Sequence, residues 1–323
     1  MNSTDPPHTA ESPQPILELR DIRRYFGTAE SSRLLSALGV RGNSRVKAVD
    51  GVSFRIYPNE IVGVIGESGS GKSTLGKLIV GLLAPTAGTI HFRDTELSAL
   101  SDREFRALRS DIQFVFQDPM SSLNPRMTIG DLIREPLVNF ESMTGPQMDR
   151  RIAELMEWVN LPPRFASRYP HELSGGQLQR VVIARAIAPN PDLIVADEPV
   201  TGLDVSIQSQ IINLFKKIQR ETSMSVLFIA HDLSVIRYVS DRVVVMYLGE
   251  IVEQGRTGDV FRDPHHPYTR ALKEAIPGSG TARRLGVTDQ PASPRDPPSG
   301  CSFHPRCPAY IGVLCKDEDP EDR

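Results

Sequence analysis

Residues 66–74, with the sequence GESGSGKST, combine residue types that bind phosphate groups. They fit the pattern G-x-x-x-x-G-K-[ST], in which the backbone N–H groups of a glycine-rich loop converge on phosphate oxygens. In this pattern the lysine supplies a positive charge and the following hydroxyl ligates magnesium. The segment therefore predicts a site for a nucleoside triphosphate with Mg²⁺, held by Gly66, Ser68, Gly69, Ser70, Gly71, Lys72, Ser73 and Thr74.

Two consecutive carboxylates follow a second apolar segment. Residues 193–199 read LIVADEP, so Asp197 and Glu198 come at the end of an expected strand. Carboxyl ends of parallel strands form the edge of the sheet at which ligands bind. Beside the phosphate loop, Asp197 would be the acid on the magnesium side and Glu198 the group that polarises the attacking water. An ordinary turn after a strand is the alternative interpretation of this pair.

Three further side chains are candidates because of where they stand. Gln117 follows the apolar residues 112–116, and its amide could reach magnesium or the attacking water. His231 follows the apolar residues 225–230, and its imidazole could hydrogen-bond a γ-phosphate. Phe26, with Tyr25 as a weaker candidate, could stack on an adenine ring. A purely structural role is the alternative for each of them.

The segment 171–180, HELSGGQLQR, predicts a second anion site. Ser174 is a favourable helix N-cap, and Gly175 and Gly176 leave backbone N–H groups exposed where the expected helix begins. One mononucleotide does not require two such sites in one small domain. We therefore expect this turn to close on nucleotide bound to another copy of the same fold, so that catalysis requires a dimer. A common capped helix is the alternative.

Apolar periodicity predicts the elements that must position these residues. The helix that follows the loop is expected from Lys72 to about Leu83, with Leu75, Leu78, Ile79 and Leu82 on its apolar face. Alternation of strands and helices predicts a mainly parallel sheet in an α/β fold. The remaining expected strands cover 16–26, two segments within 46–68, 112–116, 193–196, 225–230 and 242–249, and the helices cover 206–221, 232–239, 267–275 and most of 128–188.

The bulk composition excludes several classes of protein. Lys and Arg total 37 against 40 for Asp and Glu, a formal net charge of −3, so no general positive field would attract nucleic acid or anionic lipid. No apolar run is long enough for a membrane helix, and the first residues do not resemble a signal peptide. We expect a cytoplasmic chain with a disordered lead over 1–15 and a surface insertion over 27–47. Any role at a membrane would depend on partners.

The order of these motifs, completed by LSGGQ at 173–177 and GLD at 202–204, resembles the nucleotide-binding subunits of ABC transporters. The resemblance covers about residues 16–255. It implies a P-loop fold with a mainly parallel core sheet, an antiparallel β subdomain, a helical subdomain over about 117–188 and a C-terminal extension over 256–323. It further implies that Ser174, Gly175 and Gln177 contact the γ-phosphate held by the opposite subunit's loop. Finally, it implies that Asp204 bridges the two sites, Glu198 is the catalytic base and Gln117 communicates with a permease.

A narrower resemblance concerns residues 116–137, 266–272 and 297–308, which are similar to the ATPases of oligopeptide, dipeptide and nickel importers. It is closest to the member that pairs with a second, similar ATPase. The implied cofactors are ATP and Mg²⁺. The implied partners are a second ABC ATPase, either a paralogue or another copy, two transmembrane permease subunits and an extracytoplasmic substrate-binding protein. The implied location is the cytoplasmic face of the membrane, as a peripheral subunit.

Three cysteines, Cys301, Cys307 and Cys315, stand close together near the C-terminus. An odd number confined to one segment is not typical of a secreted disulfide framework. In the importer family this tail can bind a [4Fe–4S] cluster, but here three thiolates have no fourth cysteine. His304 or a water molecule would occupy the fourth ligand position, or this position would stay empty. Binding of zinc and a reduced, unliganded tail are further alternatives.

Two other functions remain open at this level. The first is a soluble ABC-type ATPase without a transport role; such proteins usually carry long coiled-coil insertions or tandem ATPase domains, and this sequence contains neither. The second is a metal- or redox-sensing module in which ATP is structural, which the presence of Glu198 and His231 disfavours. Oligopeptide or dipeptide import is the favoured function, although the cargo itself is chosen by other proteins.

Overall fold

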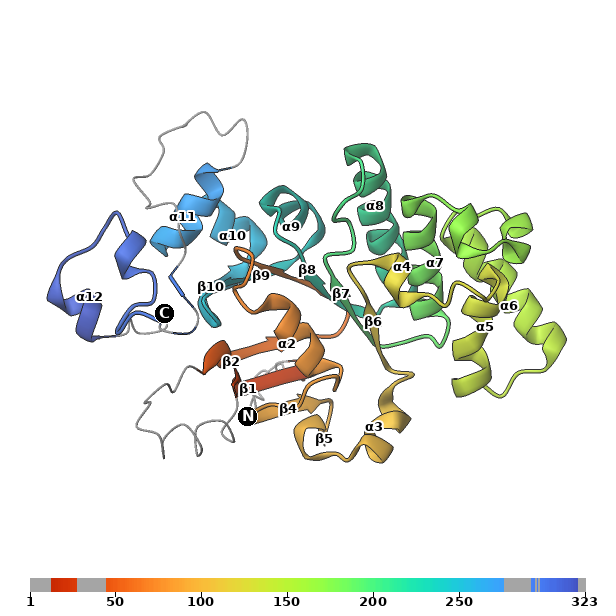
Figure 1. The fold of residues 1–323 in the computed structure, drawn as a ribbon, viewed down its shortest axis with the longest axis horizontal. Coiled ribbons are helices and arrows are strands. Elements are labelled where there is room, and N and C mark those ends of the chain that lie inside the picture. Colours follow the sequence, from red (N-terminus) through yellow and green to blue (C-terminus); the bar gives the residue numbers. More distant parts are fainter. Residues whose placement is uncertain (1–12, 28–44, 276–291, 294, 296, 319–323) are drawn as a thin grey trace, which may run out of the picture.

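The computed structural model describes residues 13–27, 45–275, 292–293, 295 and 297–318. Most of the expected disordered lead at 1–15 and of the expected insertion at 27–47 lies outside these residues. Within the described part, an α/β core carries a group of helices on one side and the C-terminal segments on the other (Figure 1).

Six of the described strands form a mainly parallel sheet, in the order β10-β9-β3-β8-β7-β6. Every residue of β3, β7 and β8 is buried, which agrees with apolar side chains on both faces of these central strands. The expectation of an α/β fold with a mainly parallel sheet is confirmed. The strands are β3 (Ile61–Ile65), β6 (Ile112–Val115), β7 (Leu193–Asp197), β8 (Ser225–Ile229), β9 (Arg242–Tyr247) and the antiparallel β10 (Glu250–Arg256).

A second, antiparallel sheet has the order β2-β1-β4-β5 in the described residues. Its strands are β1 (Leu17–Phe26), β2 (Val46–Ile56), β4 (Ala87–Phe92) and β5 (Thr95–Glu96). Helix α2 (Lys72–Ile79) lies between the two sheets (Figure 1). Its residues Leu75 and Leu78 share one core with Leu19 of β1 and Val62 of β3. The phosphate loop therefore leads into a helix that is fixed from both sides.

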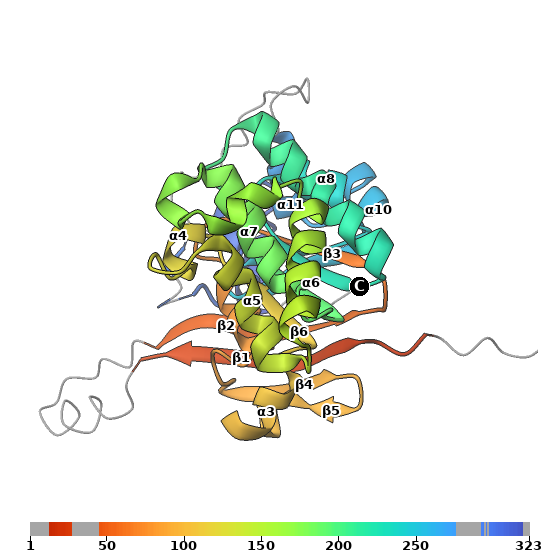
Figure 2. The ribbon, with the colours of Figure 1, turned by 90° about the vertical axis from the view of Figure 1, so that its right-hand side faces the viewer.

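The helices of the middle of the chain gather at one end of the parallel sheet, on the right in Figure 1, and Figure 2 views the molecule from that side. These are α4 (Pro119–Ser122), α5 (Ile129–Phe140), α6 (Gly145–Trp158) and α7 (Gly175–Ile187), with short 3-10 turns at Pro163–Ser167 and Pro170–Glu172. The other described helices are α3 (Asp102–Leu108), α8 (Val205–Thr222), α9 (Leu233–Val239), α10 (Thr257–Arg262), α11 (Pro267–Glu274) and α12 (Val313–Asp317), with 3-10 turns at Leu97–Ala99 and His304–Arg306. None of the helices in the described ranges has both the length and the apolar character needed to span a bilayer.

The expected length of the helix after the loop is wrong. Helix α2 ends at Ile79, and Gly81 follows in the left-handed region with φ +67°. The N–H of Leu82 donates to the carbonyl of Lys77 at 2.9 Å, so the chain turns away from the helix axis. As a result the side chain of Leu82 is 53% exposed and does not belong to the apolar face.

Candidate nucleotide site

The phosphate loop ends in a conformation that glycine favours. Gly71 is the N-cap of α2 with φ +101°, and a Cβ atom there would lie 2.1 Å from the carbonyl oxygen of Ala48. Lys72, the next residue, is buried, and its ammonium donates to the carbonyl oxygens of Gly66 at 2.8 Å and Glu67 at 2.9 Å. Burial lowers the pKa of Lys72. The loop thus wraps around its own lysine at the start of a helix.

The start of α2 and the end of β7 meet at one edge of the sheet. The hydroxyl of Ser73 donates to Oδ1 of Asp197 at 2.8 Å. Asp197 is buried, and this burial raises the pKa of its carboxyl, while the hydrogen bond from Ser73 acts in the opposite direction. The structure therefore brings together the hydroxyl and the first carboxylate that the sequence assigned to a magnesium site.

Glu198 is the meeting point of three other side chains. Its Oε2 atom lies 3.1 Å from Nε2 of Gln117, 3.2 Å from Nδ1 of His231 and 2.9 Å from Oγ1 of Thr201. The backbone of Glu198 has φ +48°, which is uncommon for a residue with a side chain, and its N–H donates to the carbonyl of Ile229 on the neighbouring strand β8. This conformation directs the carboxylate toward groups that come from three different segments of the chain.

Thr201 was missed by the sequence analysis. It stands three residues after Glu198, at the start of the TGLD turn, where a hydroxyl can reach back to the carboxylate. A hydroxyl residue at this spacing from a strand-end acid was the available signal, but short polar residues are common in turns.

The turn at Ser174 lies apart from the phosphate loop of its own chain. Ser174 is the N-cap of α7, and its N–H donates to Oε1 of Gln177 at 3.0 Å. Gly176 approaches α8 so closely that a Cβ atom would lie 2.5 Å from Cγ2 of Ile207. Helix α7 packs against α4, α5, α6 and α8, whereas the loop leads into α2. Within one chain the structure does not bring Ser174, Gly175, Gly176 and Gln177 to Lys72.

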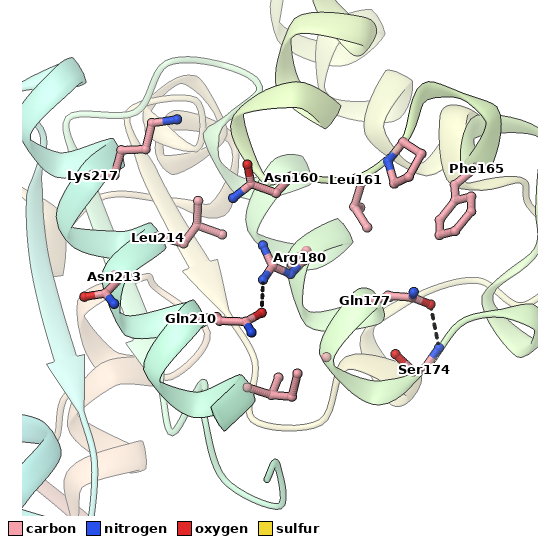
Figure 3. Close-up of a pocket in the computed structure, with 13 residues that line it drawn as sticks. Asn160, Leu161, Phe165, Ser174, Gln177, Arg180, Gln210, Asn213, Leu214 and Lys217 are labelled. Carbon is pink, nitrogen blue, oxygen red and sulfur yellow. Dashed lines mark hydrogen bonds between the residues drawn. The ribbon is translucent and has the colours of Figure 1, made fainter. Parts of the chain in front are cut away.

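An open pocket of about 610 Å³ borders this turn between α7 and α8 (Figure 3). Arg180, which lines this pocket, is buried and donates to the carbonyl oxygen of Val159 at 2.7 Å and to Oε1 of Gln210 at 2.8 Å. These bonds tie α7 to its neighbours behind the turn. Ser174 and Gly175 themselves remain exposed, and so does Asp204, the N-cap of α8. The turn can therefore receive a ligand presented by another molecule.

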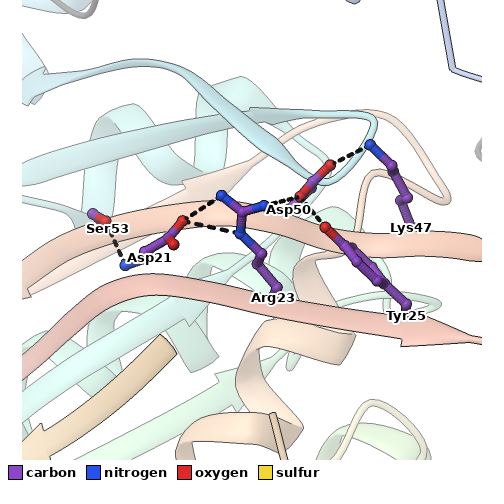
Figure 4. Close-up of polar contacts among 6 residues, drawn as sticks. All are labelled: Asp21, Arg23, Tyr25, Lys47, Asp50 and Ser53. Carbon is purple, nitrogen blue, oxygen red and sulfur yellow. Dashed lines mark hydrogen bonds and ion pairs between the residues drawn. The ribbon is translucent and has the colours of Figure 1, made fainter. Parts of the chain in front are cut away.

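The two aromatic candidates for adenine differ in their surroundings. The hydroxyl of Tyr25 donates to Oδ1 of Asp50 at 2.5 Å, and Lys47 donates to the other oxygen of the same carboxylate at 2.8 Å (Figure 4). Phe26 is 36% exposed, and the guanidinium of Arg24 lies 4.8 Å from its ring centroid. Tyr25 is held in a polar network, so Phe26 has the more accessible ring.

The cysteine tail does not form the metal site that the sequence suggested. In the described ranges, no group of three or more His, Cys, Asp or Glu side chains is arranged to hold a metal ion. Burial raises the pKa of the thiols of Cys301 and Cys307. The backbone N–H of Cys301 donates to the carbonyl of Cys315, so the segment is closed by main-chain contacts instead. The geometry therefore does not support an iron–sulfur or zinc site.

Comparison with known proteins identifies the family. Residues 49–201 match the family model described as ABC transporter, and residues 252–312 match the model described as oligopeptide/dipeptide transporter, C-terminal region. The chain is 47% identical over 319 residues to the oligopeptide transport ATP-binding protein AppF of Bacillus subtilis, an alignment that covers 97% of this chain and 95% of AppF. This chain belongs to the ABC transporter ATPases.

Other relatives agree with this assignment. The oligopeptide transport ATP-binding protein OppF of Escherichia coli is 46% identical over 311 residues, which cover 94% of this chain and 92% of OppF. Among solved structures, the ATP-binding cassette MJ0796, a dimer bound to ADP and Pi, superposes with a TM-score of 0.66 at 32% identity, over 75% of this chain and 98% of MJ0796. As an ABC ATPase, the chain hydrolyses ATP. A redox module with purely structural ATP finds no support in these relatives.

Proposed function

We propose that this ABC ATPase powers a membrane importer of oligopeptides or dipeptides. It would work at the cytoplasmic face with a second ABC ATPase chain, two permease subunits and an extracytoplasmic substrate-binding protein. Two observations support the cargo class: the relatives named above are oligopeptide transport proteins, and residues 252–312 match the C-terminal region of oligopeptide and dipeptide transporters.

The convergence of Gln117, Thr201 and His231 on one oxygen of Glu198 carries the mechanism. These contacts hold the carboxylate at the sheet edge, and no described side chain is hydrogen-bonded to its other oxygen, Oε1. Glu198 can therefore accept a proton from the water that attacks the γ-phosphate. Lys72 and the N–H groups at the start of α2 bind the phosphates and offset their charge.

The residues near Ser73 fit a magnesium ion. The Ser73 hydroxyl and the Asp197 carboxylate are oxygen donors of the kind that Mg²⁺ prefers, and they are in direct contact. Among the described residues no lysine or arginine forms an ion pair with the buried Asp197, and the more distant charges of Lys77 and Lys72 offset its charge only in part, so a divalent cation would offset the remainder. Gln117 is the candidate for a further ligand. Bound magnesium would neutralise charge on the phosphate oxygens.

The separation of the Ser174 turn from the loop supports a site shared between two chains. An exposed, glycine-rich helix start is suited to an anion, and its own chain offers it none. In the proposed arrangement, Ser174, Gly175 and Gln177 contact the γ-phosphate held by the partner ATPase, and Asp204 lies between the two sites. Closure around ATP and reopening after hydrolysis would then move the helices around Gln117 and the permeases with them.

The substitution Glu198→Gln tests the catalytic assignment. It keeps the shape of the side chain and removes the base, so the full-length chain with its partners should still bind ATP while steady-state hydrolysis falls at least about 100-fold. Glu221→Gln, at the exposed end of α8, is the matched control and should leave hydrolysis unchanged. Undiminished hydrolysis by the Glu198→Gln protein would remove Glu198 as the base.

The cargo is tested separately by transport. Vesicles that contain the chain with its permeases should take up labelled di- or oligopeptides only when ATP is supplied and the substrate-binding protein is present. ATP hydrolysis stimulated by a non-peptide cargo, without peptide uptake, would reject the peptide assignment and leave the ATPase assignment intact.

A further inference from the structure

The C-terminal extension reaches back to the phosphate loop. Arg306, in the 3-10 turn His304–Arg306, forms two hydrogen bonds with the carboxylate of Glu67, the second residue of the loop. The Nη1–Oε2 distance is 2.8 Å and the Nη2–Oε1 distance is 3.0 Å. A guanidinium that engages both carboxylate oxygens fixes the orientation as well as the position of its partner. Two segments 239 positions apart in sequence are thus joined at the nucleotide site.

This ion pair is partly shielded from water. The side chain of Arg306 is 10% exposed and that of Glu67 is 32% exposed. The hydrogen bonds that Arg306 donates to the carboxylate of Glu67 raise the pKa of Arg306, so the guanidinium stays charged despite its burial. Among the described residues, Arg306 makes one further polar contact, a 3.4 Å hydrogen bond to the hydroxyl of Tyr247. A shielded, bidentate ion pair of this kind contributes more to stability than an exposed ion pair does.

Tyr268 holds the same loop residue through the backbone. Its hydroxyl accepts a hydrogen bond from the N–H of Glu67 at 2.9 Å. Tyr268 is 1% exposed and packs against Tyr247 and Phe303, with ring centroids 4.7 and 5.4 Å apart. Phe303 stands three residues before Arg306. One aromatic cluster, Tyr247, Tyr268 and Phe303, therefore positions both of the groups that contact Glu67.

Glu67 connects these contacts to the lysine of the loop. Its carbonyl oxygen accepts from the ammonium of Lys72 at 2.9 Å. The three polar groups of Glu67 are therefore all engaged: the N–H by Tyr268, the carbonyl by Lys72 and the carboxylate by Arg306. Displacement of Glu67 would alter the loop backbone beside the lysine that binds phosphate.

We propose that Arg306 and Tyr268 are positioning residues for the phosphate loop, which they fix from the C-terminal extension by holding Glu67. This inference rests on the proposed ATP site. A loop held in its binding conformation binds ATP more tightly than one that samples others, because apparent affinity falls with the fraction of competent molecules. The attacking water is handled by Glu198 on a different strand. Loss of the contact should therefore weaken ATP binding more than it slows turnover.

The first test is Arg306→Gln in the full-length chain. The dissociation constant of a non-hydrolysable ATP analogue and the KM for ATP should each rise about three- to tenfold, while kcat stays within about twofold. Arg306→Lys keeps the charge but cannot form the bidentate pair of hydrogen bonds. Its affinity for ATP should therefore lie between those of Arg306→Gln and the unmodified chain. The control is Arg262→Gln, an exposed arginine of the same extension that pairs with Asp259 and should have no effect. An unchanged KM in Arg306→Gln, or a loss confined to kcat, would overturn the proposal.

A double-mutant cycle tests whether the effect passes through Glu67. Glu67→Gln alone should raise the KM for ATP by a similar factor. The KM of the double variant should be no higher than that of either single variant. Fully additive losses would show that the two residues act independently and would reject the inference. Tyr268→Phe, which removes one hydroxyl from the cluster, should also raise KM. If Arg306→Gln folds poorly, Glu67→Gln still tests the contact from the more exposed side.

Lys72→Ala separates this inference from the function on which it rests. Loss of ATP binding is expected, because the substitution removes the phosphate-binding charge. ATP binding equal to that of the unmodified chain would reject the proposed site altogether. If Lys72→Ala abolishes binding while Arg306→Gln and Glu67→Gln bind ATP normally, only the role of the C-terminal extension is rejected.

Discussion

Ser73 and Asp197 are in direct contact, since the serine hydroxyl donates a 2.8 Å hydrogen bond to the carboxylate across 124 positions of sequence. The contact arises because β3, which leads into the phosphate loop, and β7, which ends at Asp197, both flank β8 in the parallel sheet. Their carboxyl ends therefore reach the same edge. The pair places a buried carboxylate where a nucleotide and its cation would meet.

The burial of Asp197 predicts a trade between stability and activity. Its folded pKa is raised above the ordinary value of 3.8, so its contribution to stability is present below that value and is lost as pH rises through the folded pKa. Asparagine does not ionise, so Asp197→Asn avoids the loss of stability that accompanies ionisation of the buried carboxyl. We expect the free energy of unfolding of Asp197→Asn to exceed that of the unmodified chain at neutral pH, while Mg²⁺-dependent hydrolysis falls sharply.

Urea unfolding measured from about pH 8 down to the ordinary carboxyl pKa of 3.8 checks this sign. The stability advantage of Asp197→Asn should shrink as the pH decreases, because the native carboxyl takes up its proton. An advantage that does not depend on pH, or a destabilised variant at neutral pH, would contradict the argument.

Thr201 is expected to orient the catalytic carboxylate. Thr201→Val keeps the shape but removes the hydroxyl that donates to Glu198 at 2.9 Å. We expect kcat for ATP to fall roughly three- to tenfold, with KM nearly unchanged, since one of three contacts on Oε2 is lost. Thr201→Ser, which keeps the hydroxyl, is the matched control. Equal activity in the valine and serine variants would show that the hydrogen bond has no part in catalysis.

Gly176 and Gly175 should respond differently to an added methyl group. In Gly176→Ala the new Cβ would lie 2.5 Å from Ile207, whereas in Gly175→Ala the nearest atom, from Leu203, is at 3.6 Å. We expect Gly176→Ala to lower the free energy of unfolding by about 1–3 kcal/mol and Gly175→Ala to cost much less. Thermal or urea unfolding measures both. Combination with Ile207→Ala should recover part of the loss in Gly176→Ala, and its failure to do so would exclude the clash as the cause.

Ser174→Arg tests the shared site. The substitution adds bulk and charge to the exposed turn, so ATP-driven association of two ATPase chains should be lost while the loop of each chain still binds ATP. Ser174→Ala removes the hydroxyl but adds neither bulk nor charge, so it should weaken association less than Ser174→Arg does. Light scattering or sedimentation with ATP under non-hydrolysing conditions gives the readout. A Ser174→Arg protein that associates normally would remove the argument that the turn completes a neighbour's site.

Several parts of the fold were predictable because they depend on local patterns. The strand before the loop and those that end at Asp197 and near His231 are continuous apolar runs, which is typical of buried parallel strands. Strands β4 and β5 were missed because both are short and mix polar with apolar residues. In addition, β4 pairs with the distant β1, and β5 pairs with β4. The end of α2 was misjudged because Leu82 continued the apolar period, while the glycine before it reversed the chain.

The sequence by itself determined the motifs, their order and the strand ends on which they stand, since backbone preference and burial leave a pattern in neighbouring residues. Tertiary structure decided which side chains meet. The convergence of Gln117, Thr201 and His231 on a single oxygen of Glu198 follows from the order of the strands and one left-handed residue. The contact of Arg306 with Glu67 follows from an aromatic cluster that folds the extension onto the loop. No periodicity or residue spacing in the sequence predicts either contact, because each depends on how distant segments pack.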